Sequence, residues 1–573
     1  MKLIITKIKE HLGLFLTAIF FLTVESLSDL LQPTLMSHIV DDGVKNQDVG
    51  TVLFFGGIML GVAFVGAAGA VIRNNLSVRT SQQIGKELRS ELYRKIQAFS
   101  FENIDRLHPA SLITRITNDV TQIQNFINGT MRILVKAPIT CIGAIILIVT
   151  QTPRQIPMIV VILVISTLLI AGNMRFGYPR FVRLQRRLDR LNSVSREFLT
   201  SIRVVKAFGR EDYETGRFGT AAEELAASGI SATRVTAVFG PLINLTVNIG
   251  IVVLLWLGGT GGHQDVGKLM ASVNYMTQVL FALSMVSNIL NTMVRATASA
   301  ERVQEVLSEK AAMCEPEIPT AEKPDGRVAF ENVSFSYIHS PEKSLDNVSF
   351  CVESGQVLGI IGATGSGKST LVSLIPRFYD VTGGRVLVGG RDVRSQKTSQ
   401  HREAIGMVPQ KSRLFSGTIR DNLKWGDPEA DDKALDAAAH AACADEFING
   451  FSKGYDTVLG QGGVNLSGGQ KQRLSIARAL IRHPAILVMD DSTSALDATT
   501  EAAVMTRIRE YARGTTVILI SQRIASVMRA DKILCMDEGR VSGFGTHEAL
   551  MAESPVYREI YKSQIGDDEH ASR

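Results

Sequence analysis

The stretch Gly362-Ala-Thr-Gly-Ser-Gly-Lys368-Ser369 follows the apolar run 357–361 and precedes Thr370, where we expect a helix to begin. The glycines allow backbone N–H groups to curl around phosphates at the helix N-terminus. Lys368 supplies a positive charge to the β- and γ-phosphates, and Ser369 offers an oxygen to Mg²⁺. A glycine-rich turn without a chemical role is the alternative, but the complete motif between a strand and a helix argues against it. The predicted phosphate-binding residues are Gly362, Thr364, Gly365, Ser366, Gly367, Lys368, Ser369 and Thr370.

Two further segments of the same half extend this prediction. The run Ile486-Leu-Val-Met-Asp490 is an apolar strand that ends in an acid, which can hold Mg²⁺ at the carboxyl edge of a parallel sheet. Alone, Asp490 could be a loop residue; together with the phosphate loop it predicts a metal site. Leu466-Ser-Gly-Gly-Gln470 precedes a helix and forms a second anion-binding nest. The residues after about 327 therefore predict an α/β P-loop ATPase fold with two phosphate-binding edges.

Composition shows that this ATPase is only half of the protein. The chain has 573 residues, of which 45% are hydrophobic and 20% charged, with a net charge of +5 and a mean hydropathy of +0.14. It is too long for one globular core. Five scattered cysteines exclude a disulfide scaffold, and the modest charge does not suggest a nucleic-acid partner. Apolar stretches concentrate before residue 310, which excludes a wholly soluble enzyme.

Six of these stretches approach the roughly 20 apolar residues that a membrane-spanning helix needs. They lie at about 12–36, 51–71, 131–150, 156–173, 235–258 and 271–294. We predict an all-α membrane domain with six spans at 1–310, a linker at 311–326 and the nucleotide-binding domain at 327–573. Arginine and lysine concentrate in the polar insertions after the second and fourth stretches. By the positive-inside rule, these insertions, the N-terminus and the nucleotide-binding domain face the cytoplasm.

The N-terminus has a basic start and an apolar continuation, so a cleaved signal peptide is the alternative to consider. The apolar run is too long for one, and no small-residue cleavage site ends it. We predict instead that residues 2–11 form an amphipathic helix at the membrane surface.

Several polar residues lie inside the predicted spans, where lipid does not tolerate them. Interhelical hydrogen bonding is one interpretation, with an ion pair to Arg132 or Lys136 for the acids; a polar translocation cavity is the other. Both stay open for the amides, and the cavity is favoured for Glu25. The residues concerned are Glu25, Asp29, Asn244, Asn248, Asn274 and Gln278.

These motifs together resemble a half-transporter of the ATP-binding cassette (ABC) exporter family. Leu466–Gln470 (Leu466, Ser467, Gly468, Gly469, Gln470) matches the ABC signature, and Ser494-Ala-Leu-Asp497 matches the D-loop. The resemblance implies that Tyr337 stacks on adenine and that Gln410 senses Mg²⁺, alongside Ser369 and Asp490. It implies ATP and Mg²⁺ as cofactors, with Asp497 near the nucleotide. It also implies that residues 111–120 and 202–212 belong to intracellular loops whose tips dock on nucleotide-binding domains.

Two positions depart from the family pattern. After Asp490 the family has a glutamate that polarises the attacking water, and this chain has Asp491, which is one methylene shorter. A histidine that contacts the γ-phosphate is replaced by Gln522. Asp491 could act as a weak base, but misplacement near 1 Å can cost on the order of 100-fold in rate. Glutamine cannot carry charge or shuttle a proton as histidine can. Asp491, Gln522 and Gln410 are the predicted catalytic residues.

In the family, two nucleotide-binding domains pair head to tail, and each ATP lies between one chain's phosphate loop and the other's signature. We therefore predict a heterodimer in which this chain contributes one weakly hydrolysing site and an intact signature to the competent site. The predicted activity is ATP-driven export of amphipathic or hydrophobic compounds, including drugs and cationic molecules, across the bacterial plasma membrane. An ATP-gated or regulatory subunit, and an exporter of lipids, peptides or siderophores, remain alternatives.

Overall fold

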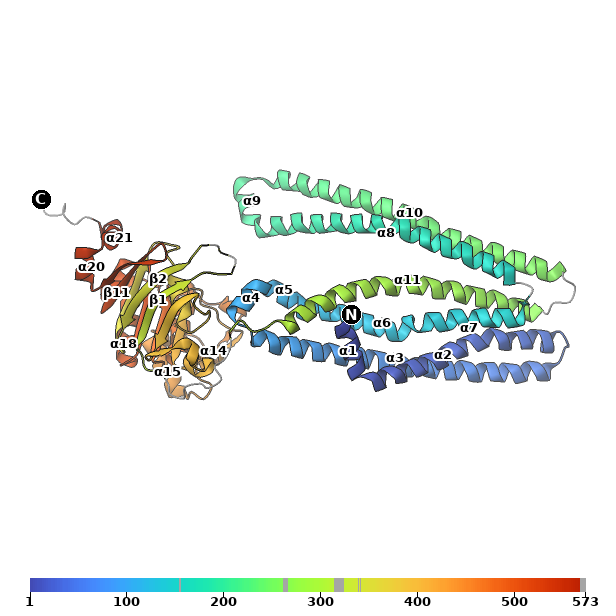
Figure 1. Ribbon diagram of the computed structural model, residues 1–573, viewed down its shortest axis with the longest axis horizontal. Helices are drawn as coiled ribbons and strands as arrows, with labels where there is room; N and C mark the ends of the chain where they lie inside the picture. The colour runs from blue at the N-terminus through green and yellow to red at the C-terminus, as the bar shows by residue number, and fades with distance from the viewer. Residues whose placement is uncertain (154–155, 261–265, 314–323, 339, 341, 567–573) are drawn as a thin grey trace. The chain divides into compact units, whose positions relative to one another are not determined.

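The computed structural model describes the chain except residues 154–155, 261–265, 314–323, 339, 341 and 567–573 (Figure 1). It divides into two compact units. The first contains Met1–Lys95 and Ala110–Glu309, and the second contains Ile96–Pro109 and Lys310–Arg573. The short segment Ile96–Pro109 therefore groups with the nucleotide-binding half, which the division at residue 310 did not anticipate. Most of the predicted linker lies outside the described residues.

The first unit is helical. Helices α8 and α10 pack along each other, and α11 packs against α2, α6 and α7 (Figure 1). Its elements are α1 (Lys2–Glu10), α2 (Leu12–His38), the π-helical turn η1 (Ile39–Val44), α3 (Val49–Gln97), α5 (Pro109–Thr114), the π-helical turn η2 (Arg115–Asp119), α6 (Val120–Gly129), the π-helical turn η3 (Thr130–Leu134), α7 (Lys136–Gln151), α8 (Ile156–Thr200), α9 (Ile202–Phe208), α10 (Glu211–Thr260) and α11 (Val266–Ser308).

Five helical segments are long and apolar enough to cross a membrane: Leu12–Val44, Val49–Gln97, Pro109–Gln151, Ile156–Thr200 and Glu211–Val253. They contain four of the predicted stretches entirely and most of the fifth. The sixth stretch lies in α11, which has 43 residues. When only its described residues are considered, α11 is not one of these five segments. A sixth span therefore stays a prediction. Helix α3 has 49 residues, more than twice the length a bilayer needs, so its basic C-terminal half extends beyond the membrane.

The predicted helix at residues 2–11 is confirmed as α1, and its location at the membrane surface stays a prediction. Ile4 is buried, and the Lys7 ammonium lies 2.7 Å from the Glu91 carboxylate of α3. His11 lies 2.9 Å from Glu87 on the same helix. These contacts hold the N-terminal segment against α3.

The second unit contains two main sheets. The larger has the order β12-β11-β3-β10-β9-β6 and is parallel except at β12; the smaller has the order β2-β1-β4-β5. The strands are β1 (Val328–Phe335), β2 (Leu345–Val352), β3 (Val357–Gly362), β4 (Gly383–Val388), β5 (Arg391–Asp392), β6 (Ile405–Val408), β7 (Gly417–Thr418), β8 (Val458–Leu459), β9 (Ile486–Asp490), β10 (Thr516–Ile520), β11 (Lys532–Asp537) and β12 (Arg540–Gly545). Strands β3, β9 and β10 are buried throughout, as a sheet covered on both faces requires.

Helices surround these sheets. The longer ones are α4 (Phe101–Leu107), α12 (Lys368–Leu374), α15 (Asp432–Ala441), α17 (Gly468–Leu480), α18 (Ala498–Tyr511), α20 (His547–Glu553) and α21 (Pro555–Ile565). The short helices are α13 (Thr398–Glu403), α14 (Ile419–Lys424), α16 (Asp445–Asn449) and α19 (Ile524–Val527). Helix α12 begins at Lys368, two residues before the predicted start at Thr370. The last residues of the phosphate loop therefore form the first turn of the helix.

Candidate nucleotide-binding site

The phosphate loop joins β3 to α12 and requires glycine at two positions. Gly362 and Gly367 have positive φ values of 157° and 91°. A Cβ atom at Gly362 would lie 2.2 Å from the Met536 carbonyl oxygen, and one at Gly367 would lie 2.7 Å from the Ser344 carbonyl oxygen. The loop can take this conformation only with glycine at these two positions, and no side chain at either position covers the backbone N–H groups.

Lys368 is 8% exposed and directs its ammonium across the loop. Its Nζ donates hydrogen bonds to the carbonyl oxygens of Gly362 at 2.8 Å and Ala363 at 2.6 Å. Burial lowers the pKa of Lys368, while the neighbouring Asp491 and Asp490 charges oppose that shift. A buried cation beside N–H groups at a helix start is suited to an anionic phosphate chain.

The expected metal ligands lie together. The Ser369 hydroxyl donates to Asp490 Oδ1 at 3.0 Å, and Asp490 is the last residue of β9. Burial raises the pKa of Asp490, and the nearby Asp491 charge adds to this. Both residues line a cavity of about 720 Å³, together with Gln410 and Lys368. Carboxylate, hydroxyl and amide oxygens are the ligands Mg²⁺ prefers, so the donor set fits this ion beside a nucleotide.

The two positions that depart from the family pattern line the same cavity. Asp491 has a positive φ of 47°, which aspartate tolerates better than most residues, and its N–H donates to the Ile520 carbonyl oxygen at 3.1 Å. Burial raises the pKa of Asp491, while a hydrogen bond from the Gln410 side chain opposes the shift. Gln522 is exposed. Both positions thus line a single candidate nucleotide site.

Tyr337 lies near this site without lining the cavity. Its hydroxyl is 3.2 Å from Thr370 Oγ1, and its ring meets the Tyr379 ring edge-on at 5.3 Å. A role in adenine stacking stays a prediction.

The signature residues form the start of α17 and do not line this cavity. Ser467 Oγ accepts the Gln470 N–H at 3.3 Å, and Gln470 Oε1 accepts the Ser467 N–H at 2.9 Å. This reciprocal cap leaves Ser467 exposed. A Cβ at Gly469 would lie 3.2 Å from the Ala495 carbonyl oxygen, so the D-loop packs directly against the signature.

Three residues that hold the loops around the site were missed by sequence reasoning. Arg523 donates to the carbonyl oxygens of Ser494 and Leu496, each at 3.0 Å. Gln472 accepts the Ala495 N–H at 3.0 Å. Gln564, on α21, donates to the Gln522 carbonyl oxygen at 2.7 Å and accepts the N–H of the residue after Arg523 at 2.8 Å. No local signal marks Gln564, whereas Arg523 and Gln472 are adjacent to recognised motifs.

Asp497 accepts the Thr500 N–H at 2.9 Å and so caps α18.

Helix α4 packs within the nucleotide-binding half. The Phe101 ring lies 4.7 Å from the Phe378 ring, and the Tyr379 hydroxyl donates to Asp105 Oδ2 at 2.6 Å. Burial and the Asp105 charge raise the pKa of Tyr379. Asp119, in the stretch 111–120, accepts a hydrogen bond from Ser299 on α11 at 2.9 Å. Docking of the stretches 111–120 and 202–212 on nucleotide-binding domains stays a prediction.

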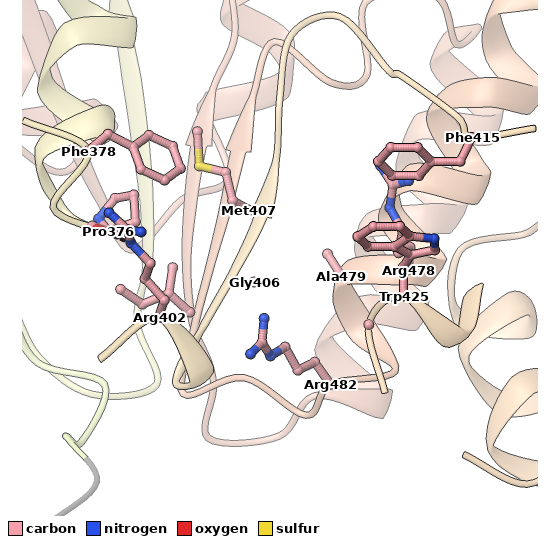
Figure 2. A pocket seen from close by; sticks show the side chains of 12 residues that line it. Pro376, Phe378, Arg402, Gly406, Met407, Phe415, Trp425, Arg478, Ala479 and Arg482 are labelled. Atoms are coloured by element: carbon pink, nitrogen blue, oxygen red, sulfur yellow. Dashed lines mark hydrogen bonds between the residues drawn. The ribbon is translucent and has the colours of Figure 1, made fainter. Parts of the chain in front are cut away.

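A groove of about 280 Å³ lies in the second unit beside this contact (Figure 2). Phe415 and Trp425 stack at 4.2 Å on one wall, and Phe378 and Met407 form the other. Its remaining lining includes Arg402, Arg478 and Arg482. The groove thus has apolar walls and three arginines in its lining.

In the membrane half, the alternative interpretation of Glu25 as an ion-pair partner of Lys136 is confirmed. Glu25 is buried, with its carboxylate 2.7 Å from Lys136 Nζ and 2.7 Å from Arg73 Nε. Lys136 also lies 2.9 Å from Asp29. No pairing of either acid with Arg132 is found in the described residues.

The four predicted cavity amides have a different setting. Asn244 and Asn248 are exposed. Asn274 donates to the Met270 carbonyl oxygen of its own helix at 3.2 Å, and Gln278 donates to the Asp29 carbonyl oxygen at 3.4 Å. Contact of these residues or the two acids with a substrate stays a prediction.

Fold and site define a membrane protein that carries a P-loop ATPase. Comparison with known proteins identifies the class further. The family model "ABC transporter transmembrane region" matches residues 15–283, and the model "ABC transporter" matches residues 345–494. The ABC transporter ATP-binding protein YfiB of Bacillus subtilis is 39% identical over 553 residues, which cover 96% of each chain. The ATP-dependent lipid A-core flippase of Aromatoleum aromaticum is 30% identical, over 99% of this chain and 96% of its own.

A solved structure extends this agreement to the whole fold. A bacterial Atm1-family ABC exporter with ATP bound superposes with a TM-score of 0.80 at 25% identity, covering 97% of this chain and 99% of its own. The chain belongs to the ABC transporter family and is an exporter half-transporter with one membrane domain and one nucleotide-binding domain. Its ATPase domain couples ATP hydrolysis to transport, and members of this class work as dimers in the lipid bilayer.

Proposed function

We propose that this chain is the subunit of a heterodimeric exporter that carries the weakly hydrolysing ATP site. The observation that supports this proposal is the shared location of Asp491 and Gln522 in the cavity with Lys368. Binding groups are retained there, whereas both groups that would act on the γ-phosphate are altered. Neutral variation would explain one altered position more easily than two altered positions that face the same γ-phosphate.

The partner subunit would complete the other site. This chain offers Leu466–Gln470 with the cap of α17 intact and Ser467 exposed. A partner with the usual glutamate and histidine would then form a competent site against this surface. ATP would close the nucleotide-binding domains, and the helical segments would pass the movement to the membrane domain.

The groove between Phe378 and Phe415 supports a docking site for the partner's second intracellular loop. The tip of that loop in this chain, α9, exposes Ile202, Val204 and Phe208. These side chains suit the apolar walls. A cysteine at Met407 of this chain and one at the partner's position equivalent to Phe208 should crosslink in the assembled pair, after native cysteines are replaced. Crosslinking confined to single chains would contradict this docking.

The proposed location is the bacterial plasma membrane, with the N-terminus and nucleotide-binding domain in the cytoplasm. The proposed cargo class is an amphipathic or hydrophobic compound, drugs included. The lipid A-core flippase among the relatives supports lipids as a further option.

The direct test is purification of the chain alone and together with its partner half-transporter. We expect slow ATP turnover for the chain alone and substrate-stimulated turnover for the pair. Brisk turnover by the chain alone, at the rate of the pair, would contradict the degenerate-site proposal. Conductance in a bilayer without substrate-stimulated ATP turnover would support the ATP-gated alternative instead.

A further inference from the structure

The helical unit has two neighbouring cavities, and Thr292 and Arg295 of α11 line both of them. The smaller, of about 380 Å³, lies between α6, η3 and α11. The larger, of about 770 Å³, lies between α8, α10 and α11. None of the six polar residues predicted from the sequence to line a cavity lines either of these two.

The smaller cavity is polar and cationic. Arg132 and Arg295 are its charged residues, and none of the described residues that line it carries a carboxylate. Gln122, Asn125 and Asn128 supply amide groups. Neither arginine has a hydrogen bond or ion pair in the described part of the chain, and both are exposed. Arginine cannot lose its proton in a protein, so both positive charges persist.

The Glu25 cluster in the same bundle provides a contrast. There, Arg73 and Lys136 are neutralised by Glu25 and Asp29 at distances of 2.7 to 2.9 Å. Cations in or near the membrane are unfavourable unless they are paired or reach water. The bundle thus neutralises one pair of cations with its own acids and leaves the pair beside the cavity for an external anion.

The larger cavity has the opposite character. Its lining is mainly aromatic and apolar, with Tyr178, Phe181 and Met174 on α8. The side-chain amide oxygen of Asn173, Oδ1, is buried there without a hydrogen-bond partner in the described residues, so it can accept a hydrogen bond from a ligand. An aromatic wall next to a cationic end fits a molecule with an apolar body and one anionic group.

We propose that these joined cavities bind an amphipathic organic anion, with its carboxylate, sulfonate or phosphate at Arg132 and Arg295 and its apolar body against α8. This inference rests on the proposed export function and gives its substrate class. It replaces the cationic preference that the sequence suggested from Glu25 and Asp29, because those acids are already paired. The alternative is that both arginines serve only as cations at the cytoplasmic membrane boundary.

Two probes with the same fluorophore separate these possibilities: dansylglycine, an anion, and dansylcadaverine, a cation. Binding is measured by fluorescence to the assembled transporter in nanodiscs, with empty nanodiscs subtracted. We expect dansylglycine to bind more tightly than dansylcadaverine, and its affinity to fall as salt rises. R132Q and R295Q should each weaken dansylglycine binding about tenfold, with R295K losing less.

The matched control is R175Q, because Arg175 is an exposed arginine of α8 that lines neither cavity. It should change dansylglycine affinity by less than about twofold. Size-exclusion profiles and thermal unfolding establish that each variant is folded. Equal binding of the two probes, an equal loss in R175Q, or no loss in R132Q and R295Q would overturn the inference. ATP turnover of the wild-type pair is measured separately: turnover without dansylglycine binding overturns only this inference, and absent turnover contradicts the proposed function.

Discussion

The two nucleotide-facing surfaces of this domain differ in what they retain. The phosphate-loop surface keeps Lys368, Ser369 and Asp490 in a binding arrangement, yet has Asp491 and Gln522 where the family has glutamate and histidine. The signature surface keeps its full motif and the reciprocal cap of α17. Under the proposed function, the difference teaches that nucleotide binding and γ-phosphate chemistry depend on separate side chains, so that a chain retains the first while it weakens the second.

The largest effect is expected at the signature surface. In G468D, a carboxylate would lie in the nest that faces the partner's ATP, and it would repel the γ-phosphate. Turnover by the assembled pair should fall on the order of 100-fold. A Cβ at Gly468 would make only ordinary contact, 3.5 Å from the Ala495 Cβ, so the domain should still fold. Steady-state ATPase assays check this, and G468A is the matched control. Unchanged turnover in G468D would break the comparison.

A smaller gain is expected at the phosphate-loop surface. The double variant D491E/Q522H restores the longer carboxylate and the imidazole in the cavity with Lys368. Turnover by the chain alone should rise about tenfold, because a base near the attacking water is worth at least this much when it is well placed. Single-turnover assays with each single variant as a control measure the gain. An equal rate in the double variant and the wild type would show that these two positions do not limit hydrolysis.

The smallest effect is a pH-dependent change in stability. Burial raises the pKa of Asp490, so its contribution to stability is fully present below the unfolded-state pKa and is lost as pH rises through the folded-state value. D490N should therefore raise the Tm of the nucleotide-free protein at neutral pH, and the gain should vanish on acidification. Thermal unfolding across this pH range measures it.

D497N is the matched control, because hydrogen bonds from Thr500 lower the pKa of Asp497. Its carboxylate contributes stability that is present above the unfolded-state pKa and lost as pH falls, so D497N should lower the Tm at neutral pH. If D490N were less stable than the wild type at neutral pH, the Asp490 charge would not be destabilised by burial. The two surfaces would then not differ in how they treat a carboxylate charge.

Much of the nucleotide-binding fold could be predicted because its motifs are local. The run Ile486–Asp490 is a strand with the predicted bounds, and the loop before Lys368 joins a strand to a helix as predicted. Contacts between distant segments could not be predicted. The pairing of Glu25 with Arg73 spans 48 residues, and the Gln564 contact to Gln522 spans 42. A single sequence carries no signal for such pairs, since many spacings place opposite charges or amides within reach.

The asymmetry of the two ATP sites is tested most directly in the co-purified pair. ATP turnover is compared between a pair in which the partner's catalytic glutamate is changed to glutamine and a pair that carries D491N in this chain. We predict that the partner's change abolishes turnover, whereas D491N leaves it within about twofold of the wild type. Turnover that survives the partner's change, or that is lost in D491N, would contradict the account.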